Sequence, residues 1–347
     1  MAVSLVLACF CCFVSPKMVW WISFFGLAYI YLLVANLCFL VIWFLSSRPK
    51  LILISLASLL IGWPFVERNV QFFSKQIPDE AYDKSVKVLT FNVQGFFQME
   101  SMNPDGTKGY ALDFFRDSEA DIICMQEFMT SQWEKDLSEE NIRKQLNKTP
   151  FYQIELSIGT SGIATFSKFP IINKKLIFSD NTTNACMFCD LLIGKDTVRV
   201  FNVHLKSIGF HDDERYLLNN VVKTEYSDSD VYTVKNIIRQ MIKSSISRVD
   251  QVDIVSSYIA QSPYPVIVCG DFNDPPSSYT YQRVRNHLKD AFVEAGSGRS
   301  TTYDIGQLSS QRIDYILYSD NYKAFDYESP REQISDHFPV MCRLVKQ

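Results

Sequence analysis

The sequence predicts an α/β fold in which sheets pack face to face between outer helices, preceded by membrane helices. Two observations support this prediction. From residue 85 to the C-terminus, many short strand-like runs alternate with a few helical stretches, as in layered α/β domains. Residues 1–66, by contrast, are almost wholly apolar and contain no acidic residue. We therefore divide the chain into a membrane region (1–66), a linker (67–84) and a folded domain (85–347).

Charge is distributed unequally between these parts. The first 66 residues carry only Lys17, Arg48 and Lys50, and the rest holds 31 basic against 38 acidic residues, a net charge of −7. Affinity for nucleic acid without sequence preference comes mainly from Lys and Arg on phosphates. The folded domain is therefore a poor general binder of polyanions, although its charge leaves room for a local basic cleft.

Three apolar runs predict three membrane helices, of which the first and third are short. They extend from Ala2 to Val14, from Met18 to Leu45 and from Leu51 to Val66, and the second is long enough to span a bilayer with tilt. Tryptophans lie near the ends of the runs, as interfacial aromatic residues do: Trp20, Trp21, Trp43 and Trp63.

The first run has two alternative interpretations, a signal peptide or a lipoprotein leader ending at Val6-Leu-Ala-Cys9. It lacks a positively charged start, which favours a helix. The 46–50 loop has two basic residues and the 15–17 loop has one, so we expect the former to be cytoplasmic. One further crossing then places the folded domain on the outer side of the cytoplasmic (inner) membrane.

Apolar periodicity predicts the strands and helices of the folded domain. Predicted strands cover 86–93, 121–126, 163–166, 171–178, 185–193, 197–205, 266–269, 313–318 and 338–344. Predicted helices cover 111–118, 132–146 and 232–260. Short turns separate several of the strands, so at least part of the sheet is expected to be antiparallel.

One strand is followed at once by polar residues that suit a site. Residues 266–269 are a continuous apolar run, typical of a buried strand, and Gly270 permits a sharp turn after it. Asp271 and Asn273 stand two residues apart, so both side chains point to one side of an extended chain. The carboxyl ends of strands carry the chemistry in α/β folds. An ordinary Asp/Asn turn is the alternative for this stretch alone.

Other predicted strands also begin or end in polar side chains. Each of these residues has a plain interpretation as a turn former or a solvated strand end, but their recurrence predicts that they converge on one site. They are Asn92, Glu127, Asn202, His204, Asp314, Asp336 and His337.

The motifs that carry these residues resemble, in order, those of the endonuclease/exonuclease/phosphatase superfamily. They are Leu89-Thr-Phe-Asn92, Gln126-Glu127, Ser161-Gly162, Asn202-Val-His204, Gly270-Asp-Phe-Asn273, Arg312-Ile-Asp314 and Ser335-Asp-His337. That superfamily includes deoxyribonuclease-like nucleases, neutral sphingomyelinases and inositol-phosphate 5-phosphatases. The resemblance implies a four-layer α/β/β/α sandwich of two mixed, largely antiparallel sheets, and a catalytic domain over 85–347 that hydrolyses phosphate esters with a divalent metal.

The resemblance also implies a role for each matching residue. Glu127 is expected to anchor Mg²⁺, or Mn²⁺ as an alternative, with Asn92 nearby and Asp336 assisting; oxygen ligands of this kind suit these hard cations. The expected catalytic residues are His204, Asp271, Asn273, Asp314 and His337.

Within this catalytic set, Asp271 is expected to orient or deprotonate the attacking water, and Asn273 to hold the phosphate or that water. Asp314 would polarise His337, and His204 would donate to a phosphate oxygen. Either Asp271 or His337 is the general base, and the sequence leaves that choice open.

Four smaller features leave alternatives open. Arg248-Val-Asp-Gln251 matches an Arg-x-x-Gln found in family members, or is an exposed helical pair. Thr160 stands where nucleases tend to carry Tyr, which weakens an abasic-site nuclease interpretation. The polar segment 206–247 is either a substrate-binding flap or a surface insertion. Cys186-Met-Phe-Cys189 has redox or zinc spacing but lies in an apolar, strand-like run.

Three functional hypotheses follow. The first is a membrane-anchored, Mg²⁺-dependent phosphodiesterase or phosphatase, whose phosphoester substrate is a lipid headgroup or a soluble compound. The second is a membrane-tethered endonuclease or exonuclease, which the acidic charge of the domain disfavours. The third is a non-catalytic receptor or scaffold that retains the fold.

Overall fold

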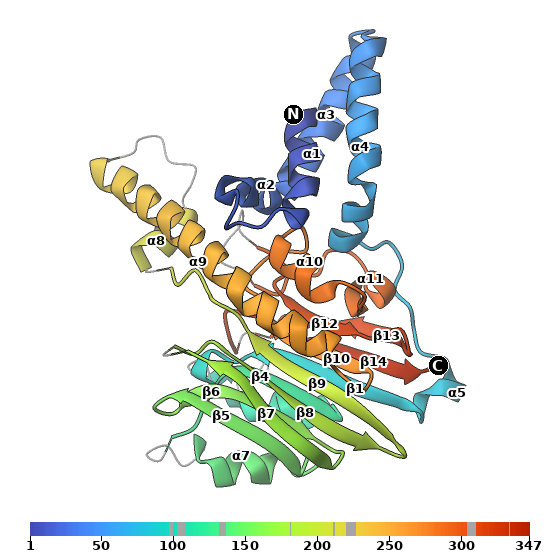
Figure 1. The fold of residues 1–347 in the computed structure, drawn as a ribbon, viewed down its shortest axis with the longest axis vertical. Coiled ribbons are helices and arrows are strands. Elements are labelled where there is room, and N and C mark those ends of the chain that lie inside the picture. Colours follow the sequence, from blue (N-terminus) through green and yellow to red (C-terminus); the bar gives the residue numbers. More distant parts are fainter. Residues whose placement is uncertain are drawn as a thin grey trace.

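Two six-stranded sheets form the centre of the computed structural model, which describes residues 1–96, 100–102, 108–131, 137–180, 182–210, 212–219, 227–303, 310–332 and 334–347 (Figure 1). The first sheet has the order β13 (Tyr322–Glu328), β14 (Val340–Lys346), β1 (Ser85–Asn92), β4 (Ile122–Met129), β6 (Ser161–Ser167), β5 (Phe151–Ile158). The second has the order β11 (Lys289–Asp290), β12 (Asp314–Tyr318), β10 (Val266–Asp271), β9 (Asp196–His204), β8 (Ala185–Ile193), β7 (Ile171–Ser179). A short hairpin pairs β2 (Glu100–Met102) with β3 (Lys108–Tyr110).

Each sheet is mixed and mostly antiparallel. Only β1–β4 and β9–β10 pair in parallel among the described strands. The inner faces of the two sheets pack on one another through fully buried apolar side chains, including Val88, Cys124, Val200, Cys269 and Ile316. Strands buried on both faces explain the continuous apolar runs in the sequence, which lack the alternation of a half-exposed sheet. The predicted pair of mixed, largely antiparallel sheets is confirmed.

Helices cover the outer faces of both sheets. α6 (Ala111–Asp117) and α7 (Glu139–Gln145) contribute to the apolar cluster outside the first sheet, through side chains such as Phe115 and Ile142. α9 (Asp228–Ala260) and α10 (Tyr279–Arg285) cover the second sheet through Val252, Val255 and Tyr281. This arrangement is the predicted four-layer sandwich. The predicted helix over 132–146 is shorter, because only α7 is helical there and residues 132–136 lie outside the described part.

Short elements complete the domain. α5 (Asp79–Tyr82) precedes β1, α8 (Asp212–Asn219) packs beside α9, and α11 (Ala291–Ala295) packs on β13. Residues 70–84, most of the predicted linker, lie along the domain and are fixed to it. Lys75 pairs with Glu294 at 2.8 Å, and the backbone N–H of Ile77 donates to Asp326 at 2.9 Å. The connection between the N-terminal helices and the domain is therefore held by specific contacts.

The N-terminal region forms a bundle of apolar helices: α1 (Ala2–Phe10), η1 (Cys11–Phe13), η2 (Trp20–Ile22), α2 (Ser23–Leu27), α3 (Tyr29–Leu45) and α4 (Pro49–Asn69). One of them, α4, is long and apolar enough to cross a membrane, and the pair 20–27 and 29–45 qualifies as a second span if its 63° bend is counted as one broken helix. The predicted count of three spans is therefore reduced to at most two, because the 2–13 helix is too short.

Gly270, directly before Asp271, lets two strands approach closely. Its φ is 142°, and a Cβ at this position would lie 1.9 Å from the carbonyl oxygen of Val203 on β9. Backbone cannot yield by that much, so we expect Gly270→Ala to cost more than about 3 kcal/mol of unfolding free energy. Gly159→Ala is the matched control, because its φ is 54° but no heavy atom lies within 4 Å. We expect that control to cost about 1–2 kcal/mol.

Chemical denaturation followed by far-UV circular dichroism measures both glycine variants. Equal losses of stability in the two variants would contradict the steric explanation for Gly270.

Candidate active site

Strand register alone brings three of the predicted site residues together. Asp271 is the last residue of β10 and pairs with His204, the last residue of the parallel strand β9. On its other side, Asp271 pairs with Asp314, the first residue of the antiparallel strand β12. The three side chains are nearly or fully buried, and the two strands that run in parallel end at the same edge of the sheet.

The other sheet contributes Asn92 and Glu127 to the same place. Asn92 ends β1, and Glu127 lies in β4 at an irregularity of the β4–β6 pairing between Met125 and Phe128. Glu127 has a φ of 50°, a conformation that non-glycine residues rarely adopt. A bulge re-aims a side chain that regular pleating would have pointed elsewhere. The sequence placed Glu127 at a strand end, whereas the strand continues to Met129.

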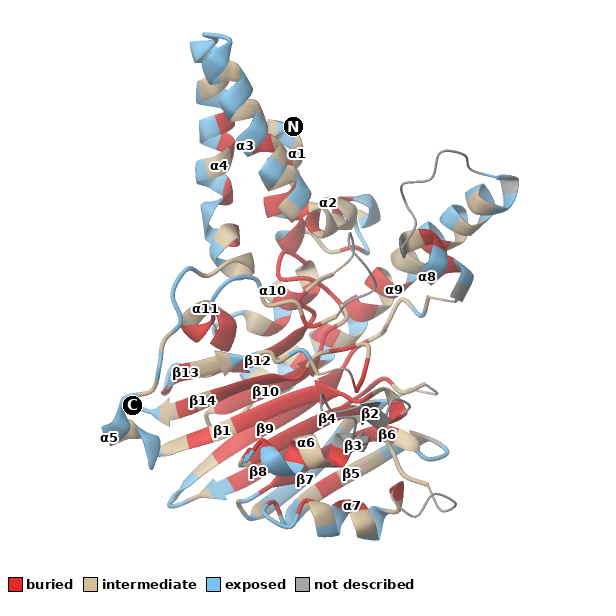
Figure 2. Ribbon diagram, turned by 180° about the vertical axis from the view of Figure 1, so that it is seen from behind, coloured by how far each residue is buried: buried red, intermediate tan, exposed pale blue. Residues whose placement is uncertain are grey.

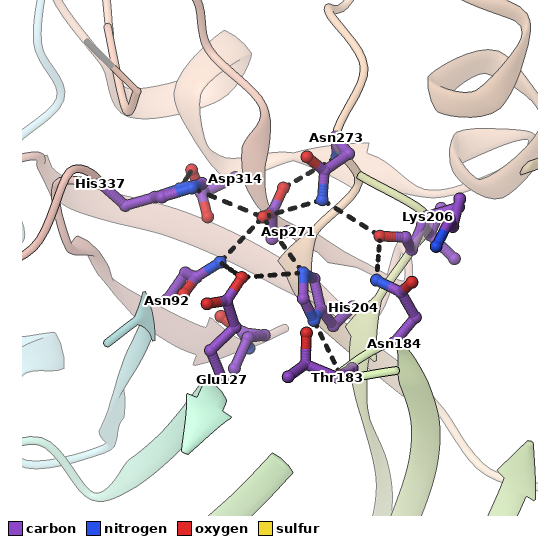
Figure 3. A network of polar contacts seen from close by, with 12 residues as sticks. Asn92, Glu127, Thr183, Asn184, His204, Lys206, Asp271, Asn273, Asp314 and His337 are labelled. Carbon is purple, nitrogen blue, oxygen red and sulfur yellow. Dashed lines mark hydrogen bonds and ion pairs between the residues drawn. The ribbon is translucent and has the colours of Figure 1, made fainter. Parts of the chain in front are cut away.

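Asp271 is the hub of the polar network (Figure 3). Its Oδ1 accepts from the backbone N–H of Asn273 at 2.8 Å, and its Oδ2 accepts from the side-chain amides of Asn273 at 3.0 Å and Asn92 at 3.1 Å. The Asn92 amide also donates to Glu127 Oε1 at 3.3 Å. Asn273 has a φ of 52°, which turns its amide back toward Asp271. The two carboxamides thus hold both carboxylates in place.

His204 is fixed by a backbone carbonyl. Its Nδ1 lies 3.0 Å from the carbonyl oxygen of Thr183, which can only accept, so Nδ1 carries a proton. Its Nε2 faces two carboxylates, 3.6 Å from Glu127 Oε1 and 3.7 Å from Asp271 Oδ2. That Nε2 is buried and has no hydrogen-bond partner within the described part of the chain. The ring is therefore oriented with Nε2 directed at Glu127 and Asp271.

His337 is held by Asp314, as predicted. Its Nδ1 lies 3.0 Å from Asp314 Oδ2, and its Nε2 lies 3.7 Å from Asp271 Oδ2. The ring of Tyr303 packs against the imidazole, with centroids 4.7 Å apart. Ser335 anchors the loop by donating to the backbone carbonyl of Asn92 at 2.8 Å. A carboxylate and a ring therefore fix both the position and the tautomer of His337.

Burial and neighbouring charges change the pKa values of Asp271 and His337. Both pKa values rise, which favours the neutral form of Asp271 and the charged form of His337. The pKa of Asp271 rises to about 6, because burial removes water from the carboxylate and Asp314 repels it, while His337 and His204 oppose the rise. Burial acts against the charge on His337, but Asp314 and Asp271 outweigh it and raise its pKa to about 10. At neutral pH the site therefore holds an imidazolium next to a carboxylate that ionises near pH 6.

A cavity of about 340 Å³ opens on this network. Glu127, Asp271, Asn273 and His337 line it, and so does Asp336, the remaining predicted ligand. The structure thus brings all eight predicted site residues to one place, with seven joined by contacts of 3.7 Å or less. Asp336 lies on the cavity wall, hydrogen-bonded at 3.5 Å to the Ser335 hydroxyl.

The donor set fits a hard divalent cation. Carboxylates of Glu127, Asp271 and Asp314 and carboxamide oxygens of Asn92 and Asn273 are the ligand types that Mg²⁺ and Mn²⁺ prefer. Asp271, Asp314 and His337 each offer a ligand atom within 4.8 Å of the others. In addition, the buried Asp314 Oδ1 has no hydrogen-bond partner in the described part of the chain. The two buried carboxylates of Asp271 and Asp314, with Glu127 beside them, leave negative charge that a cation would neutralise.

The remaining predicted motifs hold the backbone around the site. Arg248 and Gln251 fix the backbone of Lys206, two residues after His204. The Arg248 guanidinium donates to the carbonyl of Lys206 at 2.8 Å, and Gln251 Oε1 accepts from the N–H of Lys206 at 2.8 Å. Gln126 and Asn202 bond across the two sheets at 2.7 Å and are fully buried. Their role is to join the sheets below the site.

The Cys186–Cys189 pair shows no feature of a redox or zinc site. Both thiols are buried and free, and burial raises both of their pKa values. Thiolates are the reactive and metal-binding form, so these cysteines pack as small apolar side chains.

Two site residues carry no signal in the sequence. Thr183 acts through its carbonyl, which any residue type supplies, and Tyr303 lies in a loop without a recognisable motif. Only the fold could identify either of them.

Comparisons with known proteins agree with the fold. A model of the Endonuclease/Exonuclease/phosphatase family matches residues 89–337, and a domain of unknown function (DUF8431) matches residues 1–69. No curated protein matches the chain.

Solved structures resemble the fold at low identity. An endonuclease/exonuclease/phosphatase from Beutenbergia cavernae DSM 12333 has 14% identity and a TM-score of 0.50, covering 76% of this chain and 72% of its own. TDP2 from C. elegans has 20% identity and a TM-score of 0.49, covering 75% of each chain. At such identities structural similarity shows the fold alone, whereas the family model spans more than half of the chain. The chain belongs to the endonuclease/exonuclease/phosphatase family.

Proposed function

We propose that the chain is a membrane-anchored, divalent-metal-dependent hydrolase of phosphate esters. One observation carries the proposal: side chains from both sheets and from two loops, including Glu127, Asp271 and His337, line a single cavity. Members of this family typically hydrolyse phosphoester bonds, which supports the reaction class. The residues of the site supply the groups that such a reaction needs.

Asp271 is the proposed general base. Its side chain is held by Asn273 and Asn92 beside two imidazoles, and a carboxylate that ionises near pH 6 can accept a proton from water at neutral pH. His337 is committed through Nδ1 to Asp314, and the carboxylates of Asp314 and Asp271 raise its pKa and favour its protonated form, which suits a donor better than a base. These contacts favour Asp271 over His337 for that role.

The two histidines are the proposed contacts to the phosphoryl oxygens: His337 donates, and His204 can donate from Nε2 only as an imidazolium, because its Nδ1 already carries a proton. His337 and His204 each present Nε2 within 3.7 Å of Asp271 Oδ2, on either side of the proposed base. Donors fixed before the reaction stabilise negative charge that grows on the transferring group. Asn92, Glu127 and Asp336 would hold the cation, whose chemistry is to neutralise charge on the phosphate ester.

Metal removal tests the proposal directly. We expect the full chain in detergent to hydrolyse members of a panel of phosphate mono- and diesters with Mg²⁺ or Mn²⁺, and to lose at least about 10²-fold in rate in EDTA. We expect Glu127→Gln to need about 10- to 100-fold more metal for half-maximal rate.

Three results of the metal experiment would count against the proposal. Turnover that is unchanged in EDTA would exclude metal dependence. Nicking of plasmid DNA with no turnover of other esters would instead favour the tethered nuclease. No turnover of any ester, with correct folding, would favour a non-catalytic scaffold.

The α3–α4 hairpin supports membrane anchoring. It projects from the sandwich with exposed apolar residues along its length (Figure 2), among them Val41, Leu53, Leu60 and Trp63. Exposed apolar surface of this extent is unfavourable in water but suits lipid. Between the helices, the buried Ser58 hydroxyl donates to Asn36 at 3.4 Å, as polar side chains do between membrane helices.

The hairpin also bears on the side of the membrane. Arg48 and Lys50 lie at the turn between α3 and α4, at the end of the hairpin remote from the sandwich (Figure 1). A basic turn favours the cytoplasmic side. With two crossings rather than three, the proposed location of the catalytic domain is the outer side of the cytoplasmic membrane. A cysteine-labelling experiment on intact and permeabilised cells would test this orientation.

A further inference from the structure

The cavity that holds the polar network also has an apolar wall. Several apolar side chains line it together with Asp271 and His337. Six of them come from four separate parts of the chain: Phe24 and Leu27 of α2, Ile208 and Phe210 after β9, Leu218 of α8 and Met241 of α9. Phosphate recognition does not need apolar side chains. We therefore expect this wall to contact an apolar part of the substrate.

Part of this wall belongs to the N-terminal helices, which dock closely on the catalytic domain. α2 lies at the base of α1 and α3, between those helices and the sandwich (Figure 1). A Cβ on Gly26 would lie 2.5 Å from Cys11 Sγ and 3.3 Å from the carbonyl oxygen of Ser277. Cys11 Sγ donates to that same carbonyl at 2.9 Å. Only a glycine at position 26 allows α2 to pack this closely against Cys11 and Ser277. This close packing positions Phe24 and Leu27 in the wall of the cavity.

Two further contacts fix this docking. Lys17 forms an ion pair with Asp250 of α9, and η2 packs against α9. At the end of α4, the buried Arg312 guanidinium donates to the carbonyl of Arg68 at 2.7 Å and pairs with Asp290 at 2.8 Å. The apolar helices and the catalytic cavity are thus held in one orientation at both ends of the N-terminal region.

Exposed apolar residues surround α2 on the outside. Met18 is 81% exposed, and Trp20 and Trp21 are each nearly half exposed. Tryptophans in this position mark the level of lipid headgroups in a membrane protein. The apolar wall of the cavity is therefore continuous in sequence and in space with a segment suited to the membrane surface.

We propose that Phe24 and Leu27, with Leu218 and Met241, form an acyl-chain subsite. The substrate is then a phospholipid. Its phosphoester reaches Asp271 while its hydrocarbon chain lies on the apolar wall. The inference rests on the proposed hydrolase function and adds the substrate class to it. An amphiphile is the ligand that satisfies both halves of the cavity, because its phosphate suits the polar network and its chain buries apolar surface.

Binding of n-alkylphosphonates from methyl to hexyl tests the subsite without turnover. With the full chain in amphipol and Mn²⁺, we expect affinity measured by calorimetry to rise about threefold per methylene. Leu27→Ser should lower the ratio of hexyl to methyl affinity by about tenfold. Met18→Ser removes an apolar side chain of the same segment that does not line the cavity, and should leave the ratio unchanged. A flat series in the wild type would overturn the subsite.

A second measurement tests the substrate class. In nanodiscs of phosphatidylcholine and phosphatidylglycerol with Mg²⁺, we expect headgroup release that Leu27→Ser slows by about tenfold relative to Met18→Ser. A steep alkylphosphonate series without lipid turnover, while soluble esters are hydrolysed, would overturn the phospholipid and leave the hydrolase standing. A steep series with no turnover of any ester would overturn the hydrolase and leave the apolar subsite standing.

Discussion

Asp271→Asn is expected to lower kcat for phosphoester hydrolysis by about 10³-fold or more. The asparagine keeps the shape of the side chain, and its amide oxygen can still accept from the Asn273 N–H. It cannot accept a proton from water, and it places an amide between two imidazoles where a carboxylate stood. Initial rates at saturating substrate and metal measure the effect. A loss below tenfold would remove Asp271 from the role of base.

The same substitution is expected to make the metal-free protein more stable above pH 6. The folded state raises the pKa of Asp271 to about 6, so it binds this proton more tightly than the unfolded chain does. Below about pH 4 the Asp271 carboxyl is protonated in both the folded and the unfolded state, so it does not lower the free energy of unfolding. As the pH rises toward 6 only the unfolded chain ionises, and above 6 the folded state bears the full cost, up to about 3 kcal/mol.

Thermal unfolding in EDTA at pH 4, 6 and 8 measures this change. The Tm of Asp271→Asn should match the wild type at pH 4 and exceed it by several degrees at pH 8. Asp320→Asn, at an exposed carboxylate outside the cavity, is the control and should leave Tm unchanged at each pH. An Asp271→Asn protein that is less stable than the wild type at pH 8 would contradict the cost of burying the Asp271 charge beside Asp314.

His337→Gln is expected to lower kcat by about 10²- to 10³-fold. The glutamine amide can still donate to Asp314, so the fold should keep its buried hydrogen bond. It cannot carry the positive charge that Asp314 and Asp271 hold on the imidazole. Charge on the phosphoryl oxygens would then lose one fixed donor. His287→Gln changes an exposed histidine that does not line the cavity, and should leave the rate unaffected.

A double-mutant cycle separates the roles of His337 and Asp314. If Asp314 acts only by orienting and charging His337, Asp314→Asn should slow the wild type by about 10²-fold and slow the His337→Gln protein by less than about threefold. Additive losses in the double variant would mean that Asp314 acts on substrate or metal independently of His337.

The local sequence accounts for much of the fold. Apolar runs such as 185–193 and 197–205 matched β8 and β9 closely, because strands buried on both faces leave a continuous signal. Weaker signals were missed. β5 and β13 lie at the edges of the first sheet, where polar residues alternate with apolar ones, as in Phe151–Ile158, so neither strand has a continuous apolar run to mark it. α10 and α11 are too short for helical periodicity to show.

The sequence by itself determined the polar residues at the strand ends and the family that they resemble, because these residue types follow from the chemistry of phosphate and metal. Only the tertiary structure decided how they meet. Register places His204 and Asp314 on either side of Asp271, and the bulge at Glu127 turns that side chain inward. Packing also brings Phe24 and Leu27 from the apolar N-terminal region into the same cavity. Contacts between residues tens to hundreds of positions apart depend on the assembled fold, so no local pattern could reveal them.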